Sequence, residues 1–337
     1  MHILITDSGV GGLSVVAYAE RYVRSEGSTE PVRLTFANAA PENDYGYNSM
    51  PSREAKIETF DRFLRNVTER FTPDSIYVAC NTLSVLLPDT PYFAEAPVPV
   101  KGIVETGVHL LVAELEADPR AMAIIFGTQT TIDAGTYPRR LEEEGIAPSR
   151  IISQACPGLA DTISEDREGT KTRAEIARWV GEAVEKLSPV MLSRPSTRAA
   201  RSLRTGSDGE ASPNAWFSSG VIPSPAAGEG SPAVDDDRDD KRVVACLACT
   251  HYGYRKEMFA AAFHDLGIEA AVVNPNERAV DDLFGGESGE HREVEVEVVS
   301  RYRIPATALE TLTFFLRDIS PRTVAALQSF THLPELF

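Results

Sequence analysis

The sequence predicts an α/β fold in which mainly parallel strands are flanked by helices. Short apolar runs rich in Val and Ile alternate with amphipathic helix patterns along roughly the first 190 residues. Such runs between helices are typical of strands buried on both faces, as in parallel sheets. A second observation is a pattern that occurs twice: an apolar run, a cysteine and the expected start of a helix come together at Cys80 and again at Cys249.

Each predicted element has its own local signal. Strands are runs of apolar and β-branched residues, and helices are amphipathic segments, one of which is expected to end at Gly145. In chain order, the predicted elements are a strand at 2–6, a helix at 13–22, a strand at 32–37, a helix at 52–71, a strand at 75–80, a helical start at 81–87, a strand at 121–128, a helix at 130–146, a strand and helix within 242–268, a strand and helix within 270–284, a strand or hairpin at 293–304 and a closing helix at 308–319.

The alternation breaks between Ser188 and Lys241, where Ser, Pro, Gly, Ala and charged residues dominate. Such a segment buries too little apolar surface to offset the entropy lost on ordering. The sequence therefore predicts a disordered, low-complexity insert over 188–241.

Composition narrows the classes of function. The net charge of −17 and the pI near 4.9 argue against a nucleic-acid partner, since binding phosphates needs a basic face. No apolar stretch has the length of a membrane span, and the start of the chain lacks a basic signal-like region, so we expect a soluble, cytoplasmic protein with no membrane partner. Four cysteines in 337 residues do not make a disulfide scaffold, and reduced thiols are expected.

Asp7 and Ser8 follow the first predicted strand, at the carboxyl edge where parallel sheets bind ligands. The glycines of the following "GVGG" expose amide donors suited to a carboxylate or phosphate. The stretch is neither a dinucleotide fingerprint, because Ser14 takes the place of the last glycine, nor a P-loop, which needs a Gly-Lys pair. A tight turn with Asp7 or Ser8 as a helix N-cap would explain the same pattern without a ligand.

Cys80 and Cys249 each stand where a strand hands over to a helix, so the helix dipole is expected to lower the pKa of each thiol. A thiol of lowered pKa serves as a base or nucleophile near neutral pH. Either residue alone could instead be a small buried hydrophobe. Both are followed by polar residues that suit a ligand better than a core, namely Asn81 and Thr82, and Thr250 and His251.

Further candidates remain ambiguous from their sequence alone. Cys246 and Cys249 form a C-x-x-C pattern, but residues three apart on a strand face opposite sides and no second ligand pair has zinc-site spacing, so Cys246 is expected in the core. Cys156 in "QACPGLAD" could be a core or a site residue. Thr128 and Thr131 follow another strand and are either ligand donors or an N-cap turn. His251 is either an acid–base group or a structural histidine.

Two thiols facing one cleft suit the inversion of a carbon centre. One group removes a proton from one face of the carbon and the other delivers a proton to the opposite face. The carbanion beside a carboxylate also needs amide and hydroxyl donors.

Four motifs, "DSGVGGLSV", "ACNTLS", "GTQTTIDAGTY" and "ACTHY", resemble in order and spacing those of glutamate racemases, in the cofactor-independent aspartate/glutamate racemase superfamily. The resemblance implies two similar α/β domains with the active site in the cleft between them. We expect the first domain at 1–102 plus 268–337 and the second at 103–187 plus 242–267.

The resemblance also implies roles for individual residues. Cys80 would act on the α-proton of the D enantiomer with assistance from Asp7, and Cys249 on that of the L enantiomer with assistance from His251. No cofactor and no metal would be needed, the partner would be a small-molecule amino acid, and D-glutamate would supply peptidoglycan and hence cell shape. Monomer and homodimer are both open. The implied substrate-binding residues are Asp7, Ser8, Tyr45, Gly46, Asn81, Thr82, Thr128, Thr131, Thr250 and His251.

The chain departs from the family pattern in the second βα loop, "ANAAPENDYGY", which is one residue longer and has Asn38 where an acid is expected and Asp44 before Tyr45. Asn274 replaces another frequent aspartate. The altered loop leaves open a racemase of aspartate or another amino acid. Two further hypotheses are a ligand-binding protein without turnover and a thiol-redox protein built on the C-x-x-C pattern.

Overall fold

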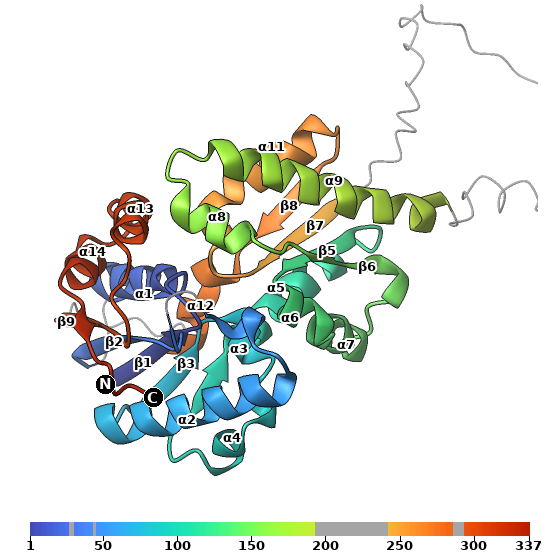
Figure 1. Cartoon of the computed structure of the whole chain (residues 1–337). Coiled ribbons are helices and arrows are strands. Elements are labelled where there is room, and N and C mark those ends of the chain that lie inside the picture. The colour runs from blue at the N-terminus through green and yellow to red at the C-terminus, as the bar shows by residue number, and fades with distance from the viewer. Residues whose placement is uncertain (27–29, 43–44, 193–241, 286–292) are drawn as a thin grey trace, which may run out of the picture. The chain divides into compact units, whose positions relative to one another are not determined.

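Two parallel sheets flanked by helices form the core of the protein (Figure 1). The computed structural model describes residues 1–26, 30–42, 45–192, 242–285 and 293–337. The strand order of the first sheet is β10-β9-β2-β1-β3-β4, and that of the second is β6-β5-β7-β8. Every strand pairing within them is parallel, so the predicted fold class is confirmed.

The strands are β1 (His2–Asp7), β2 (Val32–Asn38), β3 (Ser75–Val78), β4 (Val100–Gly102), β5 (Met122–Gly127), β6 (Ile151–Ala155), β7 (Val243–Ala248), β8 (Ala270–Val273), β9 (Val294–Ser300) and β10 (Thr331–His332). The α-helices are α1 (Leu13–Glu26), α2 (Arg53–Phe71), α3 (Asn81–Ser84), α4 (Pro91–Glu95), α5 (Ile103–Ala117), α6 (Gln129–Asp133), α7 (Thr136–Glu143), α8 (Leu159–Glu165), α9 (Thr170–Leu192), α11 (Lys256–Asp265), α12 (Pro275–Phe284), α13 (Ala306–Leu316) and α14 (Pro321–Gln328). Short 3₁₀ helices are η1 (Tyr47–Ser49), η2 (Leu87–Asp89), η3 (Pro148–Arg150) and η4 (Tyr252–Arg255).

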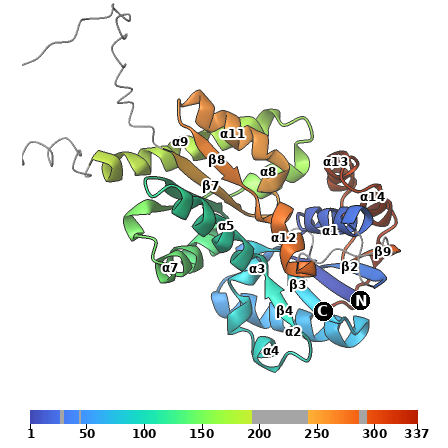
Figure 2. The same cartoon turned by 180° about the vertical axis from the view of Figure 1, so that it is seen from behind.

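The apolar strand runs are explained by burial on both faces of the sheet. Successive residues of a strand point to opposite faces, and in β1 Ile3 and Ile5 pack in one core cluster while Leu4 packs in the other. Helices α1 and α14 contribute to the cluster that holds Ile3, and α2 to the cluster that holds Leu4. The two views from opposite sides show α1 and α2 on opposite faces of the first sheet (Figure 2).

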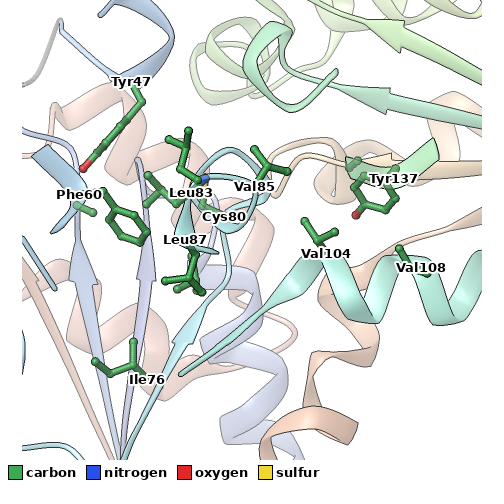
Figure 3. Close-up of a cluster of buried hydrophobic side chains, with 14 of the residues drawn as sticks. Tyr47, Phe60, Ile76, Cys80, Leu83, Val85, Leu87, Val104, Val108 and Tyr137 are labelled. Carbon is green, nitrogen blue, oxygen red and sulfur yellow. The ribbon is translucent and has the colours of Figure 1, made fainter. Parts of the chain in front are cut away.

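Figure 3 shows part of the cluster that contains Leu4, with Phe60 of α2, Val104 and Val108 of α5, and Cys80 at the end of β3. The same cluster includes Ile125 of β5, so it continues from the first sheet to the second. The strand ends that carry the two cysteines are therefore supported by a continuous apolar core.

Several elements differ from the sequence-based expectation. The single helix expected over 130–146 is two helices, α6 and α7, because Gly135 takes a left-handed conformation (φ 62°) between them. The strand or hairpin expected over 293–304 is the single strand β9, which pairs with β2 and β10. Helix α14 and strand β10 follow the helix that was expected to close the chain.

Two expected boundaries also change. A boundary at residue 268 assigns β8 to the first domain, but β8 pairs with β7 and extends the second sheet, so this sheet continues to Val273. The expected insert begins at Ser188, whereas the backbone of α9 stays helical through Pro189 to Leu192, although proline disfavours a helix interior. The rest of the expected insert, residues 193–241, lies outside the described residues.

Within the described residues, no helix combines the length and the apolar character that crossing a bilayer would require.

Candidate active site

One cavity of about 530 Å³ lies where strands of both sheets end. Parallel strands bring their carboxyl ends to the same edge of a sheet, and residues after β1, β3, β5 and β7 meet there. The lining residues that end or follow these strands are Asp7, Ser8, Cys80, Asn81, Thr82, Thr128, Cys249, Thr250 and His251. These residues, far apart in the sequence, line one cavity.

Cys80 is 5% exposed and forms the N-cap of α3, where its sulfur accepts the Leu83 amide at 3.5 Å. The Ser8 hydroxyl lies 3.0 Å from Sγ of Cys80 and donates to Oδ1 of Asp7 at 3.4 Å. Either atom of the Ser8–Cys80 contact can be the donor, and when the Ser8 hydroxyl proton points to Asp7 it is the thiol that donates to Ser8. A hydrogen-bonded path therefore runs from Cys80 through Ser8 to Asp7.

The pKa of Cys80 is raised to about 12, first by burial and then by the negative charge of Asp7, while hydrogen bonds from Ser8 and the Leu83 amide act against both. The expected lowering by a helix dipole is wrong at this position. Helix α3 has only 4 residues, so its dipole is small, and removing a thiolate from water outweighs it.

Cys249 is 6% exposed and follows β7. A turn and the 3₁₀ helix η4 come next, and α11 begins only at Lys256, so Cys249 is not placed at the start of an α-helix. Burial raises the pKa of Cys249 well above its ordinary value, the amide of His251 lowers it, and the charges of Cys80 and Asp7 raise it further. The expected lowering is wrong here too. A charge on one thiol is thus felt by the other.

Asp7 is buried and joins the two sheets, because the Thr250 hydroxyl donates to its Oδ2 at 2.8 Å. The adjoining glycines are needed for this approach. A Cβ atom at Gly11 would lie 2.5 Å from Thr250 Oγ1 and 2.6 Å from His251 Nδ1, and one at Gly12 would lie 2.8 Å from Asp7 Oδ2. The Asp7 carboxylate thus bonds within the site, and the glycines leave room for the second sheet's residues.

Three threonine hydroxyls bridge the first and second sheets. Thr82 Oγ1 lies 2.8 Å from Thr128 Oγ1 and 3.4 Å from Thr131 Oγ1, and the latter two lie 3.0 Å apart. Thr128 also caps α6 by accepting the Thr131 amide and lines the cavity, so both interpretations hold for Thr128, whereas Thr131 is not among the lining residues. Thr82 and Thr128 line the same cavity as the two thiols.

His251 lines the cavity and is partly buried. Burial lowers its pKa, which favours the neutral imidazole, while the charges of Asp7 and Asp161 raise it. Asp161 on α8 also lines the cavity and was not among the residues expected there. Its signal was its place in "QACPGLAD", just after a strand of the second sheet.

The altered second loop contributes Glu42, Gly46, Tyr47, Asn48 and Ser49 to the cavity. Tyr45, an expected binding residue, is 40% exposed and is not among the lining residues, and Asp44 lies outside the described residues.

Asn38 has a structural position rather than one in the cavity. Its Nδ2 donates to Ser300 Oγ at 3.3 Å, and its Oδ1 accepts the Ala40 amide at 2.9 Å. Asn274 likewise caps α12, where its Oδ1 accepts the Asn276 amide at 3.2 Å. Both asparagines therefore have structural roles.

The remaining two cysteines do not line the cavity. Cys246 is fully buried within β7, as expected of a core residue, and Cys156 is 2% exposed, with its thiol donating to the Gln154 carbonyl at 3.7 Å. All four cysteines lie within the described residues and carry free thiols.

Known proteins similar to the chain are glutamate racemases. No protein-family model matches the chain. It is 30% identical over 194 residues to glutamate racemase from Aquifex pyrophilus, a match of 57% of this chain and 69% of that protein. It is 28% identical over 188 residues to the enzyme from Chlorobaculum tepidum, covering 54% of this chain and 64% of that protein. The matched region thus spans about two thirds of the length of these relatives.

Solved structures agree with the fold. A glutamate racemase isoform from Bacillus anthracis superposes with a TM-score of 0.61 at 18% identity, covering 94% of this chain and 93% of that one. The enzyme from Francisella tularensis, solved in complex with D-glutamate, gives 0.59 at 17% identity, covering 94% and 93%. At these identities, the likeness concerns the fold.

Proposed function

The chain belongs to the glutamate racemase family, and on that premise we propose that it interconverts L- and D-glutamate without a cofactor, with Cys80 and Cys249 as the two acid–base groups. One observation carries the proposal. Two buried thiols, each at the end of a strand in a different sheet, line one cavity, and a charge on Cys80 raises the pKa of Cys249. Such a pair suits a reaction in which one thiol is charged while the other is neutral.

The raised pKa values imply that both thiols are protonated at neutral pH before substrate binds. The path through Ser8 offers a way to form a thiolate: the proton of Cys80 moves to Ser8 Oγ while the Ser8 proton moves to Asp7. The balance is a Cys80 thiolate and a neutral Asp7 carboxyl. The substrate's ammonium group stabilises the thiolate, since an opposite charge nearby favours the charged form.

Catalysis then alternates the charge between the two thiols. With D-glutamate, the Cys80 thiolate takes the α-proton and the Cys249 thiol delivers its own proton to the opposite face of the carbon. L-glutamate leaves, Cys80 is now neutral and Cys249 is the thiolate, which is the form needed for the reverse reaction. His251, a neutral imidazole two residues after Cys249, is suited to exchange a proton with that thiol.

The carbanion formed between the two steps carries negative charge on the α-carboxylate. The Asn81 amide and the hydroxyls of Thr82 and Thr128 line the cavity and are suited to donate hydrogen bonds to that charge, whereas the hydroxyls of Ser8 and Thr250 donate to Asp7. Fixed donors in a buried site stabilise such a charge more than water does, because they need no reorganisation. Membership of the family supports a role for the D-glutamate product in cytoplasmic peptidoglycan synthesis.

A second candidate is racemisation of an amino acid with a neutral side chain. Glu42 of the altered loop lines the cavity, and the lining residues include neither Lys nor Arg within the described part of the chain. The charge of Glu42 opposes a second substrate carboxylate on that side, although its exposure to solvent weakens this effect.

The test is α-proton exchange in heavy water without added cofactor, with L- and D-glutamate in separate samples. Proton NMR follows the α-proton signal and circular dichroism follows the optical activity. We expect both signals to decay with the native protein and neither with Cys80→Ser or Cys249→Ser. If the signals decay only with aspartate or with neutral amino acids, glutamate is not the substrate. If no amino acid exchanges its α-proton, catalysis is refuted.

A further inference from the structure

Asn81 at the start of α3 is held by a tyrosine from the other sheet's helices. Tyr137 of α7 is 1% exposed, and its hydroxyl donates to Asn81 Oδ1 at 2.7 Å. Figure 3 shows the Tyr137 ring beside Val104 and Val108 of α5, within the apolar cluster. A buried tyrosine normally finds a partner for its hydroxyl, and here that partner is a residue of the cavity wall.

The opposite end of the Asn81 amide is unsatisfied. Asn81 is 2% exposed and lines the cavity, yet its Nδ2 has no hydrogen-bond partner within the described part of the chain. A buried amide donor without a partner costs stability, which a ligand acceptor would recover. Turning the amide over would make its NH₂ donate to the tyrosine oxygen and would deprive the phenol proton of its Oδ1 acceptor. Tyr137 therefore determines which end of the amide remains for a ligand.

The tyrosine remains a donor under all working conditions, since burial raises its pKa well above the ordinary value and the neighbouring Cys246 raises it further. Its hydroxyl also has space made for it. A Cβ atom at Gly107, in the interior of α5, would collide with Tyr137 Oη and lie 2.8 Å from its Cε1. Glycine weakens a helix interior, and at this position it admits the hydroxyl that contacts Asn81.

We propose that Tyr137 is a positioning residue that fixes the Asn81 amide with its NH₂ group available to a carboxylate of the bound amino acid. This inference rests on the proposed function, since it assumes an anionic group of the substrate at Asn81. Tyr137 itself does not touch the substrate and acts through Asn81. Its loss should weaken substrate binding more than it slows proton transfer, because the thiols and their path to Asp7 are unchanged.

The first test measures kcat and KM of Tyr137→Phe in both directions. We expect KM to rise about tenfold, equal to about 1.4 kcal/mol, while kcat stays within about threefold. The matched control is Tyr92→Phe, which removes another buried hydroxyl, one that lies 2.6 Å from Thr68 Oγ1 away from the cavity. This control should leave KM unchanged. An unchanged KM in Tyr137→Phe, or an equal rise in the control, would overturn the inference.

A second test shows whether Tyr137 acts through Asn81. Kd for D-glutamate is measured by calorimetry in a Cys249→Ser background, in which bound ligand is not converted, for Asn81→Ala with and without Tyr137→Phe. We expect Tyr137→Phe to leave Kd unchanged once Asn81 is replaced by Ala. A further rise in Kd equal to the one that Tyr137→Phe causes alone would refute the positioning role. If the native protein neither racemises nor binds glutamate, the proposed function fails. If it does both and Tyr137→Phe matches it, only this inference fails.

Discussion

Replacing Asp7 by Asn separates the two effects that this carboxylate has on Cys80. The charge of Asp7 raises the pKa of the thiol, and the same carboxylate ends the hydrogen-bonded path that would receive its proton. Asp7→Asn removes both while keeping the size of the side chain. The substitution should therefore make the Cys80 thiolate easier to form at equilibrium and make racemisation slower.

The magnitude follows from the distances. Contacts of 3.0 Å and 3.4 Å through Ser8 place Sγ of Cys80 within about 6 Å of Asp7 Oδ1. With an effective dielectric constant of about 20, two unit charges at that separation interact by about 2–3 kcal/mol. Since about 1.4 kcal/mol is a factor of ten, the thiolate fraction of Cys80 at a fixed pH should rise by about one to two orders of magnitude. Loss of the proton acceptor should lower kcat by about 10²-fold or more.

The assay is the rate of Cys80 alkylation by iodoacetamide between pH 7 and 9, followed by mass spectrometry of the peptide that contains it. Asp161→Asn is the matched control, because Asp161 also lines the cavity but its charge acts on His251 and Tyr252. Slower or unchanged alkylation in Asp7→Asn would refute the electrostatic reasoning. Faster alkylation with undiminished racemisation would refute the proton path.

Three further predictions concern the packing of Gly11 against the second sheet, the structural role of Asn38, and the buried thiols of Cys80 and Cys246. Gly11→Ala should lower kcat/KM about 100-fold or more, because the added Cβ would overlap Thr250 and His251. In the control Gly9→Ala, the nearest atom to the added Cβ is His251 Cε1 at 3.7 Å, so kcat/KM should fall less than about tenfold. Equal losses of kcat/KM in steady-state assays would contradict this expectation. Asn38→Asp should lower the free energy of unfolding by about 1–3 kcal/mol, because it places a charge in a fully buried site and removes the amide donor to Ser300. An unchanged urea midpoint of unfolding would argue against the structural role of Asn38. The free energy of unfolding should fall as pH rises above about 9, at up to about 1.4 kcal/mol per pH unit for each thiol. The reason is that the pKa of Cys80 and of Cys246 is raised to about 12 in the folded protein, so the unfolded chain loses these protons at lower pH. Cys246→Ala should make this decline shallower, and an identical slope in the variant would contradict the assignment.

The sequence alone determined the fold class and the strand ends at which the candidate site lies. Runs such as 2–6 and 121–128 are mostly apolar because both faces of a parallel sheet are covered, and this pattern is local. Polar residues directly after such runs stand at the carboxyl edge for the same reason. Cys80 and Cys249 could therefore be selected as a pair before their neighbours were known.

The tertiary structure decided what depends on residues distant in the chain. The pKa values of both thiols are raised by burial and by the charge of Asp7, and the helix end that the sequence predicted is a four-residue helix at Cys80 and absent at Cys249. Asn38 became structural through Ser300, and β8 joined the second sheet through β7. The contact between Tyr137 and Asn81 spans 56 positions, and no local pattern encodes it. Desolvation and hydrogen-bond partners are properties of the packed chain, so they appear only once the two sheets are in place.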